Sequence, residues 1–211
     1  MRVSELWRYP VKSLQGERLD TAEIGADGIA GDRRWALFDV ATGAVLTARR
    51  DPDLLFAAGR LRAAGGVDIV LPDGTVTADD AVLSDWLGRP VALRSADGAG
   101  AFHDADEARL SLISTGTLGD WDRRRFRSNV VLDGAGEDAL AGSLVRLGQV
   151  ELAVGDGIPR CVMVTRPQPG GIGRDSGVLK TIHRERGGNL AVGAQVLRSG
   201  TVRTGDGLEP A

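Results

Sequence analysis

Short apolar runs separated by turn sequences dominate the chain, and they predict strands. A glycine lies in the turn between the runs of each pair, where it fits the backbone angles of a tight β-turn. Four hairpins are predicted in this way: 35–40 with 44–47, 67–71 with 75–77, 144–147 with 150–154, and 195–197 with 201–203. So many short strands indicate a β-rich, barrel-like body in which the strand edges are closed.

Helical patterns are few and short. Asp79 or Asp80 is placed to cap a helix over 81–87, which Gly88 ends. Two more helices are predicted, one from Ser114 or Thr115 through Leu118, Trp121 and Arg125, and one near 177–186. The fold class is therefore predicted to be mainly β with a few short helices (α+β).

One stretch has the composition of a linker. Residues 95–101 read Ser-Ala-Asp-Gly-Ala-Gly-Ala, small and polar throughout. It divides the chain into a predicted N-terminal β unit, 1–94, and a predicted C-terminal β unit, 95–211, which holds the cysteine.

Composition narrows the possible classes of protein. The net charge of −3 over 211 residues argues against a nucleic-acid partner. No apolar run approaches the roughly 18 residues of a membrane span, and the N-terminus is charged where a signal peptide is apolar. A single cysteine permits no internal disulfide and fits a reducing, cytoplasmic setting. Only Lys12 and Lys180 are lysines among 26 basic residues, so guanidinium groups would build any anion site.

Cys161 is the first candidate for chemistry. It follows a loop with Gly155, Gly157 and Pro159, has Arg160 beside it, and precedes an apolar β-like run. An adjacent cation favours the thiolate, which is the form that attacks or binds a soft metal. The competing interpretation is a small buried hydrophobe, the commonest environment of a free cysteine.

A set of hydrogen-bond donors stands near predicted strand ends without matching acids nearby in the sequence. Arg123–Arg125 is expected to face solvent, as charge runs usually do. Lys12 and Arg33 could also be solvated, and Asn129 could bond a turn backbone. Together the donors suit an anionic ligand that carries a thiophilic metal. They are Lys12, Ser13, Arg33, Arg127, Asn129 and Arg160.

The chain resembles MOSC-domain proteins (molybdenum cofactor sulfurase C-terminal domain) that carry the family's N-terminal β-barrel domain, among them the amidoxime-reducing components. The ordered set of motifs spans nearly the whole chain and is specific only as a set. The motifs are Tyr-Pro-Val-Lys-Ser at 9–13, Gly-Asp-Arg-Arg-Trp at 31–35, Leu-Thr-Ala-Arg at 46–49, Phe-Arg-Ser-Asn at 126–129, Arg-Cys at 160–161 and Gly-Thr-Val-Arg-Thr-Gly-Asp at 200–206.

The resemblance implies a cofactor, a reaction and partners. Cys161 would be the ligand of molybdenum, and the six donors would hold the pterin and phosphate of the molybdenum cofactor (Mo-molybdopterin). The protein would reduce small N-oxygenated, amidoxime-type substrates with electrons from an external ferredoxin- or reductase-like protein. Two departures leave the substrate open: Arg-Pro-Gln-Pro-Gly-Gly at 166–171 replaces an acidic segment, and Pro159 stands where the amidoxime reducers have serine.

Other classes of function compete with this one. Cys161 could instead carry a persulfide in a sulfur or cofactor carrier without redox turnover. It could pair with His183 in a cysteine hydrolase, although no nucleophile motif frames it. His103 with Asp104, Asp106 and Glu107 could bind a metal, but a solvated acidic loop is the simpler interpretation.

Overall fold

A computed structural model describes residues 1–96, 98, 100–104 and 108–211. Its main element is a sheet of eight strands in which every neighbouring pair is antiparallel except β10 and β11. In spatial order the strands are β16 (Leu208–Pro210), β12 (Leu144–Leu147), β13 (Val150–Pro159), β14 (Asn189–Arg198), β10 (Leu110–Ser114), β11 (Val130–Leu132), β1 (Val3–Arg8) and β2 (Glu17–Leu19).

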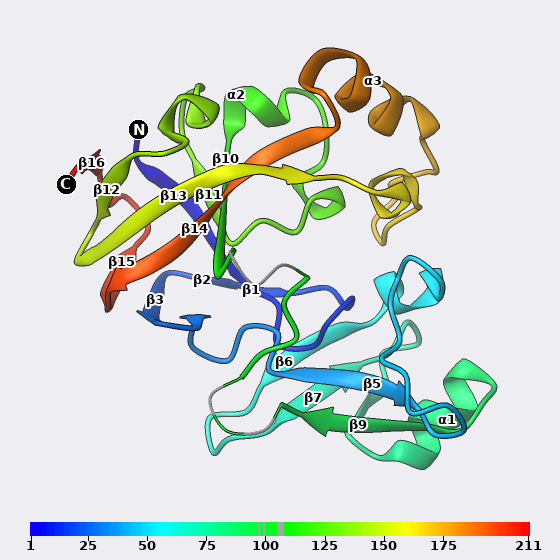
Figure 1. Cartoon of the computed structure of the whole chain (residues 1–211). Helices are drawn as coiled ribbons and strands as arrows, with labels where there is room; N and C mark the ends of the chain where they lie inside the picture. Colours follow the sequence, from blue (N-terminus) through cyan, green and yellow to red (C-terminus); the bar gives the residue numbers. More distant parts are fainter. Residues whose placement is uncertain (97, 99, 105–107) are drawn as a thin grey trace.

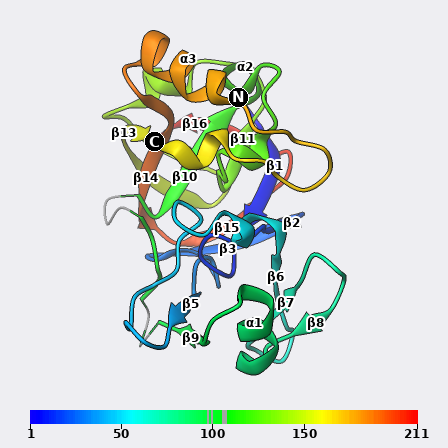
Figure 2. The same ribbon diagram turned by 90° about the vertical axis from the view of Figure 1, so that its right-hand side faces the viewer.

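Both faces of this sheet are covered. One face packs on a three-stranded sheet, β15 (Gly200–Arg203), β3 (Thr21–Gly25) and β4 (Gly28–Ile29), from which Ala22, Ile24 and Val202 enter the shared core. The other face carries α2 (Thr115–Leu118) and α3 (Ser176–Arg186), with α3 along the outer side of the sheet (Figures 1 and 2). Central strands covered on both faces must be apolar throughout, and all three residues of β11 are buried.

A second module has a core of its own. It contains a two-stranded sheet, a three-stranded sheet and one helix, which surround buried residues such as Leu37, Leu54, Ile69 and Leu83. Figure 1 shows it below the large sheet. Its elements are β5 (Trp35–Asp39) with β9 (Val91–Ser95), β6 (Ala58–Leu61) with β7 (Val67–Val70) and β8 (Val76–Thr77), and α1 (Asp80–Leu87).

Four short 3₁₀ turns complete the structure: η1 (Pro52–Phe56), η2 (Arg123–Arg125), η3 (Glu137–Leu140) and η4 (Val162–Thr165). The segment that follows β1 crosses from the large sheet into the second module. There Val11 and Gln15 bridge to Trp35 and Ala58. This crossing places the loop 9–15 between the two cores. Among the described residues, no helix is both long and apolar enough to cross a membrane.

The predicted fold class is confirmed, because the chain is mainly strands with three α-helices in its described part. The strands there form open sheets and not one closed barrel. The division at residues 94 and 95 stays a prediction. In addition, two N-terminal strands pair with strands of the C-terminal half, β1 with β11 and β3 with β15. β2 and β4 join the same two sheets by pairing with β1 and β3.

Most predicted local elements are present. The hairpins at β7–β8 and β12–β13 form as expected, and Asp79 caps α1 by accepting a hydrogen bond from the amide of Ala81. The predicted pair 35–40 and 44–47 forms only in part, through a bridge between Phe38 and Val45. The regular partner of β5 is β9, which pairs with its other edge.

Two predictions of local structure are wrong. β15 does not pair with β14 in a hairpin; it pairs with β3, where Val202 is opposite Ala22 and fully buried. The physical reason is burial: pairing with β3 brings Val202 into the main core with Ala22 and Ile24, whereas Leu197 at the end of β14 is 58% exposed. The helix predicted from Ser114 to Arg125 ends at Leu118, because Gly119 takes a positive φ of 51°.

Leu112, in the centre of β10, tests the location of the main core. Its side chain is fully buried, so Leu112→Ala should lower the free energy of unfolding by about 2–5 kcal/mol in chemical denaturation. Leu197→Ala is the matched control: Leu197 is 58% exposed, and the loss should stay within about 0.5 kcal/mol. Equal losses in the two variants would contradict the assigned core.

Candidate anion and cofactor site

Four of the predicted site residues, far apart in the sequence, line one small cavity of about 100 Å³. They are Arg33, Arg127, Asn129 and Arg160. The opposite wall is partly apolar and includes Leu110, Phe126, Ile158 and Met163. The cavity thus joins the loop after β4, the segment before β11 and the end of β13 at the side of the large sheet that faces the second module.

Three predicted site residues have a strained backbone. Ser13, Arg33 and Arg127 have φ angles of 71°, 51° and 55°, in the left-handed region that non-glycine residues rarely enter. In the described part of the chain, Ala191 is the only other non-glycine residue with a positive φ. Such conformations cost free energy and gather at binding and catalytic sites, where the surrounding structure enforces them. Two of the three, Arg33 and Arg127, line the cavity, which makes its loops a candidate functional site.

Tyr9 holds two of the cations together. The guanidinium carbons of Arg127 and Arg33 lie 4.4 Å and 5.2 Å from the centre of its ring. The phenol is buried and donates a hydrogen bond to the carbonyl oxygen of Ser128, at 3.3 Å. Burial raises the pKa of Tyr9, so the phenol keeps its proton. A cation above an aromatic ring is attracted by the ring's electron-rich face, and the attraction grows when water is excluded.

Arg127 is the least compensated of these cations. It is 5% exposed, its Nη1 donates to the carbonyl oxygen of Leu14, and no acid pairs with it among the described residues. Burial, together with the charge of Arg33, lowers the pKa of Arg127 to about 10. It remains a cation at neutral pH, and an anion in the cavity would stabilise it.

Arg33, in contrast, has a partner. Its Nη1 forms an ion pair with Asp32, and its Nη2 donates to the carbonyl oxygen of Arg127 at 3.2 Å. Although burial disfavours the cation, the carboxylate of Asp32 and the neighbouring Tyr9 raise the pKa of Arg33. Asp32 also accepts a hydrogen bond of 2.7 Å from the amide of Tyr9, so it ties this cation to the crossing loop.

Asn129 fixes the floor of the cavity. Its side-chain oxygen accepts from the hydroxyl of Ser111 at 3.1 Å and from Arg33 at 3.5 Å. Its Nδ2 donates to the carbonyl oxygen of Trp7 at 3.2 Å. The amide is therefore held between β1 and β10, and it does more than bond a turn.

Arg160 brings a donor without a partner. Its Nε donates to the carbonyl oxygen of Leu190 and its Nη1 to that of Phe126, at 2.9 Å and 3.0 Å. Its Nη2 is buried and has no hydrogen-bond partner among the residues that the structure describes. Burial lowers the pKa of Arg160 to about 10, although the adjacent Cys161 acts in the opposite direction. A buried N–H without a partner is costly, so this one indicates a missing acceptor.

Cys161 lies beside the cavity and not in its wall. It is half-buried, its thiol is free, and it begins the turn η4. The expected β-like run after it is wrong, since Val162–Thr165 is a 3₁₀ turn and 155–159 belong to β13. The thiol thus follows the end of a strand, with Arg160 on one side and Met163 two residues beyond, both lining the cavity.

Lys12 and Ser13 reach the cluster less directly. Lys12 pairs with Asp104, which lines the cavity, at 2.5 Å and donates to the carbonyl oxygen of Phe102. The hydroxyl of Ser13 accepts from the amide of Ala48 and does not line the cavity. Their role in holding a cofactor stays a prediction.

Several expectations about charges are wrong. Arg125 is buried and donates to three carbonyl oxygens, of Val164, Arg166 and Gly173, because the run 123–125 folds inward as η2. The expectation that the donors have no matching acid nearby in the sequence is also wrong, since Asp32 forms an ion pair with Arg33. The sequence analysis did not single out Tyr9 and Asp32, although they stand in the same quoted motifs as Lys12 and Arg33.

The residues of the hydrolase and metal-site alternatives do not form a catalytic arrangement in the described part of the chain. His183 is exposed on α3, and no hydrogen bond joins it to Cys161 there. His103 bonds the carbonyl oxygen of Asp27, and burial, with the charge of Arg33, lowers its pKa. No group of three or more histidine, cysteine or acidic residues is placed to hold a metal within the described ranges. Asp106 and Glu107 lie outside the described residues.

The donor set fits the anionic end of a larger molecule. Three guanidinium groups and an amide surround the cavity, and Arg160 offers an N–H that lacks an acceptor. A cavity of about 100 Å³ suits a phosphate-sized group, whereas whole small-molecule ligands occupy about 300–1,000 Å³. A phosphorylated cofactor could therefore place its phosphate here and extend toward Cys161.

Comparisons with known proteins identify the family. Residues 1–107 match the MOSC N-terminal beta barrel domain, and residues 99–209 match the MOSC domain. The chain therefore belongs to the MOSC family and carries both of its domains.

Relatives agree with this placement. Mitochondrial amidoxime reducing component 2 of Bos taurus is 28% identical over a match that covers 77% of this chain. The match spans 66% of the length of that relative. The YuaD protein of Bacillus subtilis has a similar fold, with a TM-score of 0.50 at 13% identity over 99% of this chain and 93% of that one. A hypothetical protein of solved structure has a TM-score of 0.52 at 12% identity, over 100% of this chain and 67% of its own.

Inorganic phosphate tests the cavity as an anion site. It should raise the melting temperature of the protein, because a ligand that binds only the folded state stabilises it. Arg127→Gln should lose most of this increase, since the least compensated cation is gone. Arg184→Gln is the control, because Arg184 is 70% exposed on α3, and it should keep the full increase. An unchanged response in Arg127→Gln, measured by scanning calorimetry, would rule out Arg127 as an anion ligand.

Proposed function

We propose that this protein binds the molybdenum cofactor and works as a small oxidoreductase on N-hydroxylated, amidoxime-type compounds. The observation that carries the proposal is the cluster of three arginines around one cavity, two of them with a left-handed backbone, next to a free cysteine. Membership of the MOSC family and the similarity to an amidoxime reducing component support it. A free thiol also fits the reducing, cytoplasmic setting that we propose for it.

The residues of this chain have distinct tasks in the proposal. Arg127, Arg33 and Arg160 would bind the phosphate of the cofactor, because guanidinium groups match phosphate geometry and keep their charge at neutral pH. Asn129 would orient this end through its fixed amide. Cys161 would bind molybdenum as a thiolate, and the neighbouring cation Arg160 favours that charged form.

The reaction needs electrons that this chain does not supply. Converting an N–OH group to N–H and water takes two electrons and two protons. When bound, the molybdenum cofactor supplies the two-electron redox change. A single cysteine cannot also hold an iron–sulfur relay, and Gly170-Gly-Ile-Gly173 lies in a loop after Pro169 and not at a strand–helix junction. We therefore propose an external ferredoxin- or reductase-like donor.

A carrier function is the second candidate. The half-buried thiol of Cys161 lies beside the cavity and outside its wall, where it could bear a persulfide for transfer to an acceptor. This carrier would bind no molybdenum in stoichiometric amount. Metal content thus separates the two candidates.

Substitution of Cys161 tests the metal ligand. In protein purified from a host that makes the cofactor, Cys161→Ala and Cys161→Ser should fold normally but contain little molybdenum by elemental analysis. The physical reason is the loss of the one soft ligand, which a neutral hydroxyl does not replace. Full molybdenum content in either variant would remove Cys161 from the site and return it to a structural role.

The source of electrons gives a separate test. The loaded protein should reduce benzamidoxime with chemically reduced methyl viologen and should be inactive with NADH or NADPH alone. Product formation, followed by chromatography, should appear with NADH only after a reductase is added. NADH-driven turnover by the pure chain would refute the external donor. Failure with viologen at full molybdenum content would contradict the proposed reaction without supporting the carrier, which binds no stoichiometric molybdenum.

A further inference from the structure

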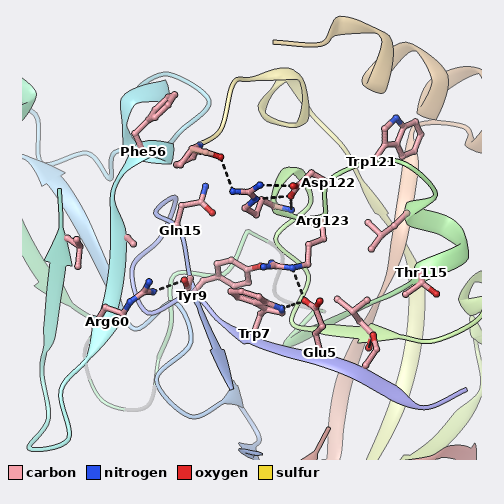
Figure 3. A pocket seen from close by; sticks show the side chains of 18 of the residues that line it. Glu5, Trp7, Tyr9, Gln15, Phe56, Arg60, Thr115, Trp121, Asp122 and Arg123 are labelled. Atoms are coloured by element: carbon pink, nitrogen blue, oxygen red, sulfur yellow. Dashed lines mark hydrogen bonds and ion pairs between the residues drawn. The ribbon is translucent and has the colours of Figure 1, made fainter. Parts of the chain in front are cut away.

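A second, larger hollow lies between the two modules. Its volume is about 760 Å³, within the range of about 300–1,000 Å³ that is typical of small-molecule sites. One side comes from β1, α2 and η2, and the other from β6, β7 and the loop after β1 (Figure 3). We call it the inter-module groove. Residues of the anion cavity do not line it, so it is a separate site.

Aromatic and aliphatic side chains give this groove an apolar lining. Trp7, Trp121 and Phe56 border it, together with Leu118 and the buried ring of Tyr9. Figure 3 shows Trp7 and Tyr9 near Arg123, with Phe56 on the opposite wall. Flat rings of this kind favour a planar aromatic ligand, because offset and edge-to-face contacts add to the burial of apolar surface.

Both acids in the groove are already satisfied. Glu5 accepts from the indole nitrogen of Trp7 at 2.6 Å and pairs with Nε of Arg123 at 2.8 Å. Asp122 takes three hydrogen bonds from Arg124, through the backbone amide, Nε and Nη2, at 2.7–2.9 Å. A cationic ligand would have to displace one of these partners, so the acids do not form a cation site.

The cations, in contrast, have donors to spare. Arg123 stacks on Trp7, with its guanidinium carbon 3.2 Å from the ring centre, and bonds Glu5 only through Nε. Its two terminal nitrogens have no partner in the described part of the chain. Arg60 uses Nη1 for the carbonyl oxygens of Gly16 and Gly59, which leaves Nη2 available on the opposite wall. With three arginines and two satisfied acids, the groove is complementary to one negative charge.

We propose that the inter-module groove is a second ligand site, which takes a planar aromatic carboxylate. The ring lies among Trp7, Trp121 and Phe56, and the carboxylate binds the terminal nitrogens of Arg123. This site does not depend on the proposed function, since the molybdenum cofactor has no part in it.

The experiment uses 2-naphthoate as the probe, with the neutral 2-naphthamide and the cationic 2-naphthamidine as matched controls. Calorimetric titration of the wild-type chain should show binding of naphthoate, with the amide at least about tenfold weaker, the loss expected for one charge-assisted hydrogen bond. In ¹⁵N spectra the indole signals of Trp7 and Trp121 should shift, and those of Trp35 and Trp86 should not. Saturating inorganic phosphate should leave naphthoate binding unchanged.

Two variants locate the carboxylate. Arg123→Gln should weaken naphthoate binding about tenfold or more and leave the amide unaffected, whereas Arg184→Gln should change neither. Arg123→Lys keeps the charge but not the planar guanidinium group, so its affinity for naphthoate should lie between those of the wild type and Arg123→Gln. It replaces Arg123→Gln in the experiment if that variant does not fold. Equal binding of naphthoate and amide, preference for the amidine, no binding of naphthoate, or competition by phosphate would each overturn the proposal.

Discussion

The structure around the candidate site depends on keeping like charges together out of water. Arg33 and Arg127 both lie against the ring of Tyr9, and Arg160 lines the same cavity. Three such cations repel one another, and each loses hydration on burial. Among the described residues, the carboxylates of Asp32 and Asp104 and the face of one aromatic ring offset part of this cost. An anionic ligand would offset the remaining positive charge. The repulsion that destabilises the empty site therefore favours the binding of an anion.

The architecture explains how this arrangement is held. Asn129 is hydrogen-bonded to β1 and β10, and four of the five residues of β10 are buried in the large sheet. The crossing loop after β1 carries Tyr9, Lys12 and Ser13 into the second module, where Val11 and Gln15 pair with its strands. Each cation is thus attached to a segment that is held by one of the two hydrophobic cores. Left-handed conformations at Arg33 and Arg127 persist because the two cores fix the chain on both sides.

Much of the fold could be predicted from the sequence because its signals are local. The apolar runs and glycine turns predicted β7–β8 and β12–β13, and Asp79 with Gly88 predicted the limits of α1. The pairing of β15 with β3 could not be predicted in the same way. It joins residues nearly 180 positions apart, and a nearby turn offered a local alternative at 195–203.

The candidate site shows the same contrast. The donors could be chosen from the sequence by residue type and motif, and four of them meet at one cavity. The groups that offset the positive charges of these donors could not be predicted. In the sequence, Tyr9 has the pattern of an ordinary core aromatic residue and Asp32 that of a turn residue. Arg125 belongs to a run of charges that is expected at the surface, yet it is buried and donates to three backbone carbonyl oxygens. Such roles depend on acceptors from distant segments, which no local pattern reveals.

A crystal structure of the protein purified from a host that makes molybdenum cofactor is the most direct measurement of the central claim. Our account predicts cofactor density with its phosphate at Arg33, Arg127 and Arg160, and molybdenum at bonding distance from the sulfur of Cys161. Cofactor bound elsewhere, or molybdenum without the sulfur of Cys161 as a ligand, would contradict it.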